Sequence, residues 1–176
     1  MPRIPYLPSD LREPADVVSA VRARRGGSLL NLDRMLLHSP ALAQGWNTYM
    51  GAVRTRLSVS ARLREIAICT VAVINEADYE FIHHAPELLA AGGTQAQVDA
   101  LRQPQAAAAN TSLFDEDERA TIELTLDMTR SIKVRTGLIE TLDARIGHTA
   151  TVELVAAIAA YNMVSRLLIA LGVEPE

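Results

Sequence analysis

Residues 60–93, "SARLREIAICTVAVINEADYEFIHHAPELLAAGG", decide the fold of this chain. In the first half, apolar side chains recur three and four residues apart, which predicts a helix with Ser60 as its N-cap. The second half, from Asn75, also has helical spacing and ends at the pair Gly92-Gly93, a typical helix stop. Because only Asn75-Glu76 connect the two, we expect a tight helical hairpin.

The rest of the chain extends this helical pattern. Val and Ile occur at helical spacing among Ala and Leu, so we predict an all-α fold of about eight helices. Residues 1–13, with three prolines, are expected to form an extended arm, and residues 14–176 a single domain. Thr94 and Gln97 have the spacing of a capping box, whereas residues 104–112, "PQAAAANTS", are expected to form a loop.

Composition excludes several classes of protein. The 176 residues carry a formal net charge of −4, which argues against a nucleic-acid-binding protein. Cys69 is the only cysteine, so no intrachain disulfide can form, as is typical of a reducing compartment. The N-terminus has no apolar signal segment, and we expect a cytoplasmic protein.

The most apolar stretch, residues 152–173, is long enough to span a bilayer. It is interrupted by Glu153, Asn162 and Arg166, so a helix that is buried in the protein or in an interface is favoured. Its segment from Val152 to Leu171 is apolar nearly all round, and such a helix needs cover on every side. We therefore expect a homo-oligomer and no membrane partner.

The hairpin gathers groups that can transfer protons. Residues three and four apart share one helix face, so Glu80 should lie beside both His83 and His84, and Tyr79 beside His83. A carboxylate next to an imidazole fixes its tautomer, as general acid/base chemistry requires. Glu65 on the preceding helix could reach the same face across the hairpin. A solvated surface pair of Glu and His is the plainer interpretation of this spacing.

Other chemistries are less well supported. Glu80-x-x-His83 is half of a di-iron motif, but the chain has no second Glu-x-x-His, so we expect no metal and no other cofactor. Glycine-rich phosphate loops, a serine elbow and a CxxC pair are all absent from the sequence. Cys69 fits a buried small apolar residue better than a nucleophile.

The segments "LRE" (residues 63–65) and "ADYEFIHHAPELLAAGG" (residues 77–93) resemble the carboxymuconolactone decarboxylase family, which includes the alkylhydroperoxidase D-like proteins. Residues 24–47 and 161–173 resemble the longer members of that family. The resemblance implies an all-helical fold that assembles into trimers or hexamers, with active sites near subunit contacts.

The family pattern can be transferred residue by residue. In the peroxidase branch a glutamate, a CxxC pair and a histidine form the site. Here Glu65 matches the glutamate and His84 the histidine, while Ala77 and Glu80 stand at the two cysteine positions. Disulfide exchange needs two thiols, so the peroxidase chemistry should not carry over. The decarboxylase branch, with a glutamate four residues before the histidine, resembles this chain better.

The resemblance therefore implies a cofactor-free acid/base enzyme acting on a small carboxylated lactone or enol acid, such as those of aromatic-compound degradation, by decarboxylation or isomerisation. His84 is expected to transfer the proton, with Glu80 orienting or polarising it and Glu65 completing a relay. His83, Tyr79 and Arg166 are candidate substrate-binding residues. Arg166 is chosen because an arginine in an apolar helix needs an anionic partner, and a structural salt bridge is the alternative. A Cys69 peroxidase and a non-catalytic helical oligomer with a ligand pocket remain alternatives.

Overall fold

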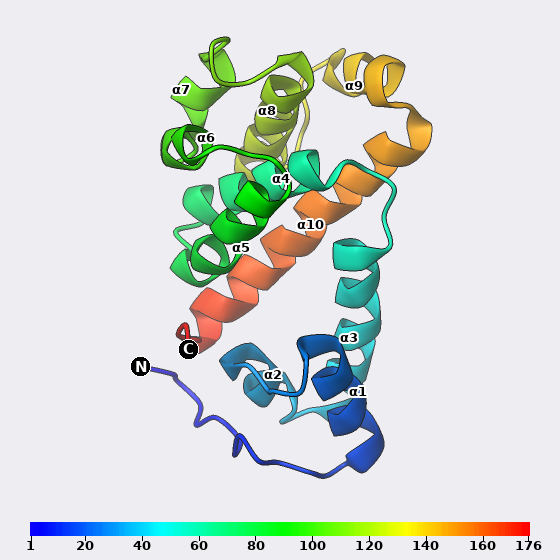
Figure 1. The fold of residues 1–176 in the computed structure, drawn as a ribbon, viewed down its shortest axis with the longest axis vertical. Helices are drawn as coiled ribbons and strands as arrows, with labels where there is room; N and C mark the ends of the chain where they lie inside the picture. Colours follow the sequence, from blue (N-terminus) through cyan, green and yellow to red (C-terminus); the bar gives the residue numbers. More distant parts are fainter. The chain divides into compact units, whose positions relative to one another are not determined.

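A computed structural model describes all 176 residues, and every regular element in it is a helix (Figure 1). The ten helices are α1 (Ala15–Arg25), α2 (Asn31–Leu36), α3 (Pro40–Thr55), α4 (Ala61–Ile74), α5 (Asp78–Ala90), α6 (Gln95–Ala100), α7 (Pro104–Ala109), α8 (Glu116–Ser131), α9 (Leu138–Ile146) and α10 (His148–Leu171). The all-α prediction is confirmed. The helix count differs from about eight partly because the expected loop at residues 104–112 contains α7.

The chain divides into two compact units. The first comprises residues 1–56 and 167–176, with α1, α2, α3 and the end of α10. In it, the extended residues 1–13 are fixed by backbone contacts such as Arg3 N–H donating to the carbonyl of Leu171 at 2.9 Å. The expectation of a single domain from residue 14 stays a prediction.

The second unit, residues 57–166, contains the predicted hairpin. The connection between α4 and α5 is three residues long, and the N–H of Ala77 closes it on the carbonyl of Ala72 at 2.8 Å. At the other end of α5, Gly92 has a φ of +88° and the N–H of Gly93 bonds to the carbonyl of Leu88, which is the predicted glycine stop. The helical hairpin is therefore confirmed.

Helix starts in this unit follow the local sequence in most cases. Thr94 and Asp115 each form a capping box, with Gln97 and Glu118 respectively, and so fix the first turns of α6 and α8. Ser60 does occupy the N-cap position of α4, but its side chain makes no capping hydrogen bond. The N-terminus of α4 is therefore less firmly held by its own sequence than the other two.

One apolar cluster ties the helices of the second unit together. It contains buried residues of α4, α5, α6, α7 and α8 together with the loops between them, namely Ile66, Cys69, Ala72, Phe81, Leu88, Val98, Leu101, Ala107, Ala108, Phe114, Ile122 and Leu126. Aliphatic side chains dominate it, since aromatic residues make up only 4% of the chain. This cluster holds α4 and α5 rigidly enough to position polar groups on their other faces.

The last helix, α10, is the one element long and apolar enough to cross a membrane by length and composition alone. In the structure one stripe of it is buried, including Leu154, Ile158, Tyr161 and Ser165, and the opposite side is not. The expectation that the helix is covered on every side is therefore not met within a single chain, since Val152 is 68% exposed and Met163 41%.

Candidate active site

Two helices of the second unit carry the three ionisable groups that the sequence predicted to be catalytic. Glu65 comes from α4, and Glu80 and His84 come from one face of α5. All three are buried, with exposed fractions of 4%, 2% and 4%. Ionisable side chains this deeply buried need specific partners, and the identity of those partners defines the chemistry of the site.

Glu65 and His84 form the first pair. The two are joined by a hydrogen bond of 2.6 Å between Oε2 of Glu65 and Nδ1 of His84, and Nε of Arg64 donates to the other carboxylate oxygen at 3.2 Å. Burial alone would raise the pKa of Glu65, but the hydrogen bonds and charges of His84 and Arg64 outweigh it and hold this pKa below its usual value. An ionised Glu65 can only accept, so Nδ1 carries the hydrogen and Nε2 is the nitrogen that exchanges protons in the neutral ring.

This contact is the one expected across the hairpin, and it also changes the expected roles. We expected Glu80 to orient or polarise His84 and Glu65 to complete a relay. In the structure the carboxylate bonded to Nδ1 of His84 is that of Glu65. Glu65 is therefore the residue whose geometry orients the ring, and Glu80 needs a separate account.

Glu80 is held by α10. Its Oε2 is hydrogen-bonded to Oγ of Ser165, and Oγ of Ser165 also donates to the carbonyl of Tyr161 at 2.8 Å. Burial raises the pKa of Glu80 to about 8, against a lowering effect of the Ser165 contact. Glu80 is thus a neutral carboxylic acid at pH 7.

The direction of the hydrogen bonds agrees with a neutral Glu80. A serine hydroxyl has one hydrogen, and the carbonyl of Tyr161 can only accept it. If Ser165 donates to Tyr161, its oxygen accepts the acid hydrogen of Glu80, so each hydrogen has one acceptor. The second oxygen of Glu80, Oε1, is buried without a hydrogen-bond partner, and this costs far less for a neutral acid than for a carboxylate.

Tyr161 links the two pairs. Its ring meets the ring of His84 edge to face, with 4.8 Å between centroids and an interplanar angle of 86°. Its carbonyl accepts from Ser165, the partner of Glu80. Sequence reasoning missed both Tyr161 and Ser165. The signal was present, because a serine inside an apolar helical stretch needs a hydrogen-bond partner.

The neighbouring candidates on α5 form a separate pair. The rings of Tyr79 and His83 stack with centroids 4.3 Å apart. Nδ1 of His83 donates to the carbonyl of Tyr79 at 2.7 Å. Tyr79 is buried and His83 half-buried. They lie close to the site in sequence, and their role as substrate-binding residues stays a prediction.

Arg166 does not behave as expected. We predicted an arginine held in apolar surroundings and in need of an anion. The residue is exposed, and its guanidinium donates to the carbonyl and side-chain oxygens of Asn162, one turn earlier in the same helix. Because the exposed side of α10 lets the charge stay in water, neither an anionic substrate nor a salt bridge is needed to explain Arg166.

Cys69 lies in the apolar cluster with no exposed surface. Burial and then the negative charge of Glu65 raise the pKa of its thiol well above the usual value. The thiolate is the reactive form of cysteine, so this side chain is chemically quiet in the folded state. The expectation of a buried small apolar residue is confirmed.

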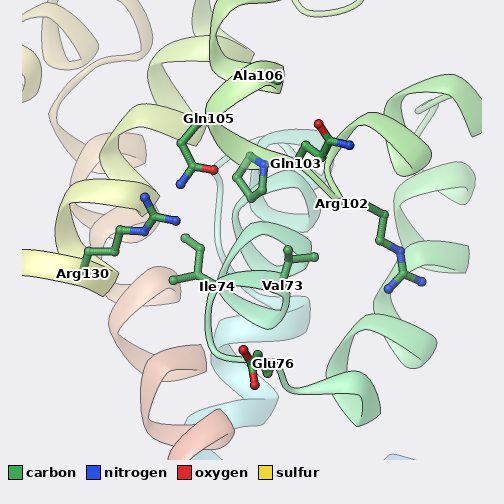
Figure 2. A pocket seen from close by; sticks show the side chains of 9 residues that line it. Val73, Ile74, Glu76, Arg102, Gln103, Gln105, Ala106 and Arg130 are labelled. Carbon is green, nitrogen blue, oxygen red and sulfur yellow. The ribbon is translucent and has the colours of Figure 1, made fainter.

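A pocket of about 460 Å³ lies elsewhere in the same unit, at the far end of α4 (Figure 2). None of the residues Glu65, Glu80 and His84 lines it. This pocket and the buried acid/base groups are therefore different places.

Comparison with known proteins agrees with this architecture. Residues 40–115 match the carboxymuconolactone decarboxylase family, a segment that includes Glu65, Glu80 and His84. The match covers the central helical segment of the chain, and the resemblance seen there in the sequence is confirmed. No curated protein matches the chain.

Two solved structures share the fold over nearly the whole chain. One is an uncharacterized peroxidase-related protein from Silicibacter sp. TM1040, with a TM-score of 0.81 and 16% identity, over 99% of this chain and 94% of that one. The other is described as an alkylhydroperoxidase AhpD core, an uncharacterized peroxidase-related protein from Ralstonia eutropha JMP134. Its TM-score is 0.78 and its identity 19%, over 99% and 92% of the two chains. At these identities the likeness establishes the fold alone.

Proposed function

We propose that this protein is a cofactor-free acid/base enzyme of the carboxymuconolactone decarboxylase family. Its substrate would be a small carboxylated lactone or enol acid, and its reaction decarboxylation or isomerisation in the cytoplasm. The observation that carries the proposal is the 2.6 Å contact by which Glu65 holds Nδ1 of His84, beside a neutral Glu80 four residues away on the same helix. Two groups held in different protonation states at one pH are the usual basis of acid/base catalysis.

In isomerisation, Nε2 of His84 would remove the proton from a carbon next to a carbonyl. The electron pair of the broken C–H bond moves onto the carbonyl as an enolate, and Glu80 donates its proton to the other end of the conjugated system. The proton now on His84 then returns to the carboxylate of Glu80, which restores both groups. Glu65 stabilises the intermediate imidazolium through the same hydrogen bond that orients the ring.

In decarboxylation, the C–C bond to the substrate carboxylate breaks and CO₂ leaves, so that its electron pair forms the enolate. Only one proton is needed, and Glu80 donates it to carbon. A proton from solvent restores Glu80 once the product has left. Burial supports both versions, because bulk water is kept from the reactive groups.

The experiment is a screen of carboxylated lactones and enol acids for turnover, with CO₂ release and product isomers measured separately. Glu80→Gln should lower the turnover of the accepted substrate by about 10²–10⁴-fold in either reaction, and His84→Asn should do so for isomerisation. His148→Asn is the matched control, since His148 has a side chain that is 92% exposed and should leave turnover unchanged. Full activity in Glu80→Gln, with the fold retained by circular dichroism, would remove the proposal.

A second candidate is a helical oligomer without catalytic activity. The observation that favours it is the same burial of all three groups, which leaves each less than 5% exposed in a single chain. Absence of turnover on every compound of the screen would favour this candidate. A peroxidase, suggested by the names of the two similar proteins, is disfavoured by the buried Cys69. Peroxide turnover in the same screen that disappears in Cys69→Ala would favour it instead.

We also propose that the chain assembles into a trimer or hexamer. The support is the apolar, exposed side of α10, with Val152 at 68% and Met163 at 41% exposed. Large exposed apolar side chains on one helix face are typical of subunit contacts. Size exclusion with light scattering at low micromolar protein should give three or six times the 19.1 kDa of the chain. A stable monomer would contradict the assembly.

A further inference from the structure

The pocket at the far end of α4 is a second site candidate. It has a volume of about 460 Å³, within the range of small-molecule sites, and lies wholly in the second unit. Its walls come from the end of α4, the turn before α5, the segment before α7 together with the first turn of α7, and the end of α8 (Figure 2). Val73 in its floor is eight residues beyond Glu65, about 12 Å along the helix, so the pocket is distinct from the acid/base groups.

Two arginines flank this pocket, and neither has a carboxylate partner. Arg130 lies against the side-chain amide of Gln105, whose oxygen, turned towards it, accepts from both terminal nitrogens. Arg102 lies over the ring of Phe81, with 3.6 Å between its guanidinium carbon and the ring centroid. By contrast, Arg135 in the same unit forms salt bridges with acidic side chains. Both arginines are exposed, so water solvates their charges in the free protein, and no carboxylate of the protein competes with a ligand for them.

The two cations reach the pocket from opposite sides. Figure 2 shows Arg130 and Gln105 pointing towards one another on one side, Arg102 on the other, and the apolar Val73 and Ile74 between them. The stacking of Arg102 on Phe81 restricts its side chain, which lowers the entropy lost when a ligand binds. A cation with an apolar floor beside it suits a ligand with an anionic end and a hydrocarbon body.

Glu76 lies in the lining of the pocket and contributes its one negative charge. This residue is exposed and has a φ of +55°, a conformation that non-glycine residues adopt rarely and that is found preferentially at functional sites. With two guanidiniums and one carboxylate, the lining has a net charge of +1. Glu76 would repel a second anionic group on the ligand and accept a hydrogen bond from a hydroxyl.

We propose that this pocket binds a small aliphatic or aromatic monocarboxylate that carries a hydrogen-bond donor at its opposite end. The carboxylate pairs with the fork of Arg130 and takes over the place of the Gln105 oxygen, because a charge-assisted pair is stronger than a neutral acceptor. The hydrocarbon body covers Val73 and Ile74, and the hydroxyl end meets Glu76. The site is independent of the acid/base chemistry proposed above.

The test uses three matched probes on the full-length protein: 6-hydroxyhexanoate, its neutral amide 6-hydroxyhexanamide, and the dianion adipate. Binding is followed by amide chemical shifts in ¹H–¹⁵N spectra, which also locate the site. Arg130→Gln should weaken 6-hydroxyhexanoate at least tenfold, because a charged hydrogen-bonded pair is lost. Lys133→Gln is the control, since it removes a cation just beyond the same end of α8 but outside the pocket lining.

The expected result has four parts. The carboxylate binds and the amide does not. The Arg130→Gln variant no longer binds 6-hydroxyhexanoate tightly, and the Lys133→Gln variant binds it as the parent does. Adipate binds more weakly than 6-hydroxyhexanoate, and Glu76→Gln restores adipate binding. Equal shifts from the amide, equal losses in both cation variants, or shifts outside the pocket would overturn the proposal. The Glu76→Gln arm keeps the test decisive if Arg130→Gln is poorly folded.

Discussion

Glu65 and Glu80 are two glutamates of one compact unit, buried to the same depth, and their carboxyl groups are held in opposite states. Glu65 has an imidazole and a guanidinium as partners, and its pKa is lowered in spite of burial. Glu80 has a hydroxyl as its partner, and burial raises its pKa to about 8. Depth alone therefore says nothing about the charge of a buried acid.

The difference between the two lies in what each partner can give. A cationic partner compensates a carboxylate for the water it has lost, whereas a hydroxyl that already donates elsewhere can only accept. Ser165 donates to Tyr161, so the simplest state of Glu80 is the neutral acid. Substitutions that change charge without changing shape test this comparison directly.

The largest effect is expected at Glu65. Glu65→Gln removes a buried negative charge, so Arg64 loses its ion pair and Nδ1 of His84 loses its charged acceptor. This should lower the free energy of unfolding by about 3 kcal/mol at pH 7. Urea unfolding followed by circular dichroism measures this. Glu140→Gln, on the exposed side of α9, is the control and should change stability by less than about 0.5 kcal/mol. A loss at Glu65 no larger than in this control would mean that the negative charge of Glu65 does not stabilise the site.

Glu80 should show the opposite sign in a pH series. Below about pH 4.5 the group is protonated in both the folded and unfolded states. From there to about 8 the unfolded chain ionises while folded Glu80 keeps its proton, so the free energy of unfolding falls with rising pH. The expected slope is about 1.4 kcal/mol per pH unit near pH 6–7.

Glu80→Gln removes this titration. The free energy of unfolding of the variant minus that of the parent should therefore rise with pH over the same interval. Other titrating groups contribute to both proteins and cancel in the difference. A difference that stays constant from pH 5 to 8 would show that Glu80 ionises normally in the folded protein, and the comparison with Glu65 would fail.

A smaller effect is expected at Ser165, which joins Glu80 to α10. Ser165→Ala removes the acceptor of the acid hydrogen and should lower the free energy of unfolding by about 1.5 kcal/mol. In a Glu80→Leu background the same change should have almost no effect, which gives a coupling energy of about 1.5 kcal/mol in a double-mutant cycle. Equal costs in both backgrounds would mean that Ser165 acts through its bond to Tyr161 alone.

Much of this arrangement could be predicted from the sequence because it depends on local patterns. Helical spacing and the glycine pair fixed the hairpin, and the hairpin brought Glu65 to His84 across a short turn. The same reasoning failed at α7, where the alanine run after Pro104 was assigned to a loop. Alanine has the highest helix propensity and proline is favoured in the first turn, so propensity outweighed the loop-like flanks.

The third helix of the site could not be predicted in this way. Which stripe of α10 faces the hairpin depends on packing between segments about 80 residues apart, and the apolar pattern of α10 is nearly uniform round the helix. Arg166 was chosen for its charge, yet its neighbour Ser165 is the residue that faces Glu80. Adjacent residues point about 100° apart on a helix, so an error of one position exchanges a buried partner for an exposed side chain.

The smallest effect is expected at Cys69, one turn beyond Glu65 on α4. Its thiol is enclosed by the apolar cluster and its pKa is raised, so it should stay unreactive towards a thiol reagent until the protein unfolds. Cys69→Ala removes one buried sulfur atom and should lower the free energy of unfolding by about 1 kcal/mol, with turnover of the accepted substrate unchanged. Labelling rates in increasing urea, compared with the unfolding curve, measure the first claim. Rapid labelling of the native protein would show that the apolar cluster opens beside Glu65. Water could then enter the site, and the lowered pKa of Glu65 would need an explanation that does not assume burial.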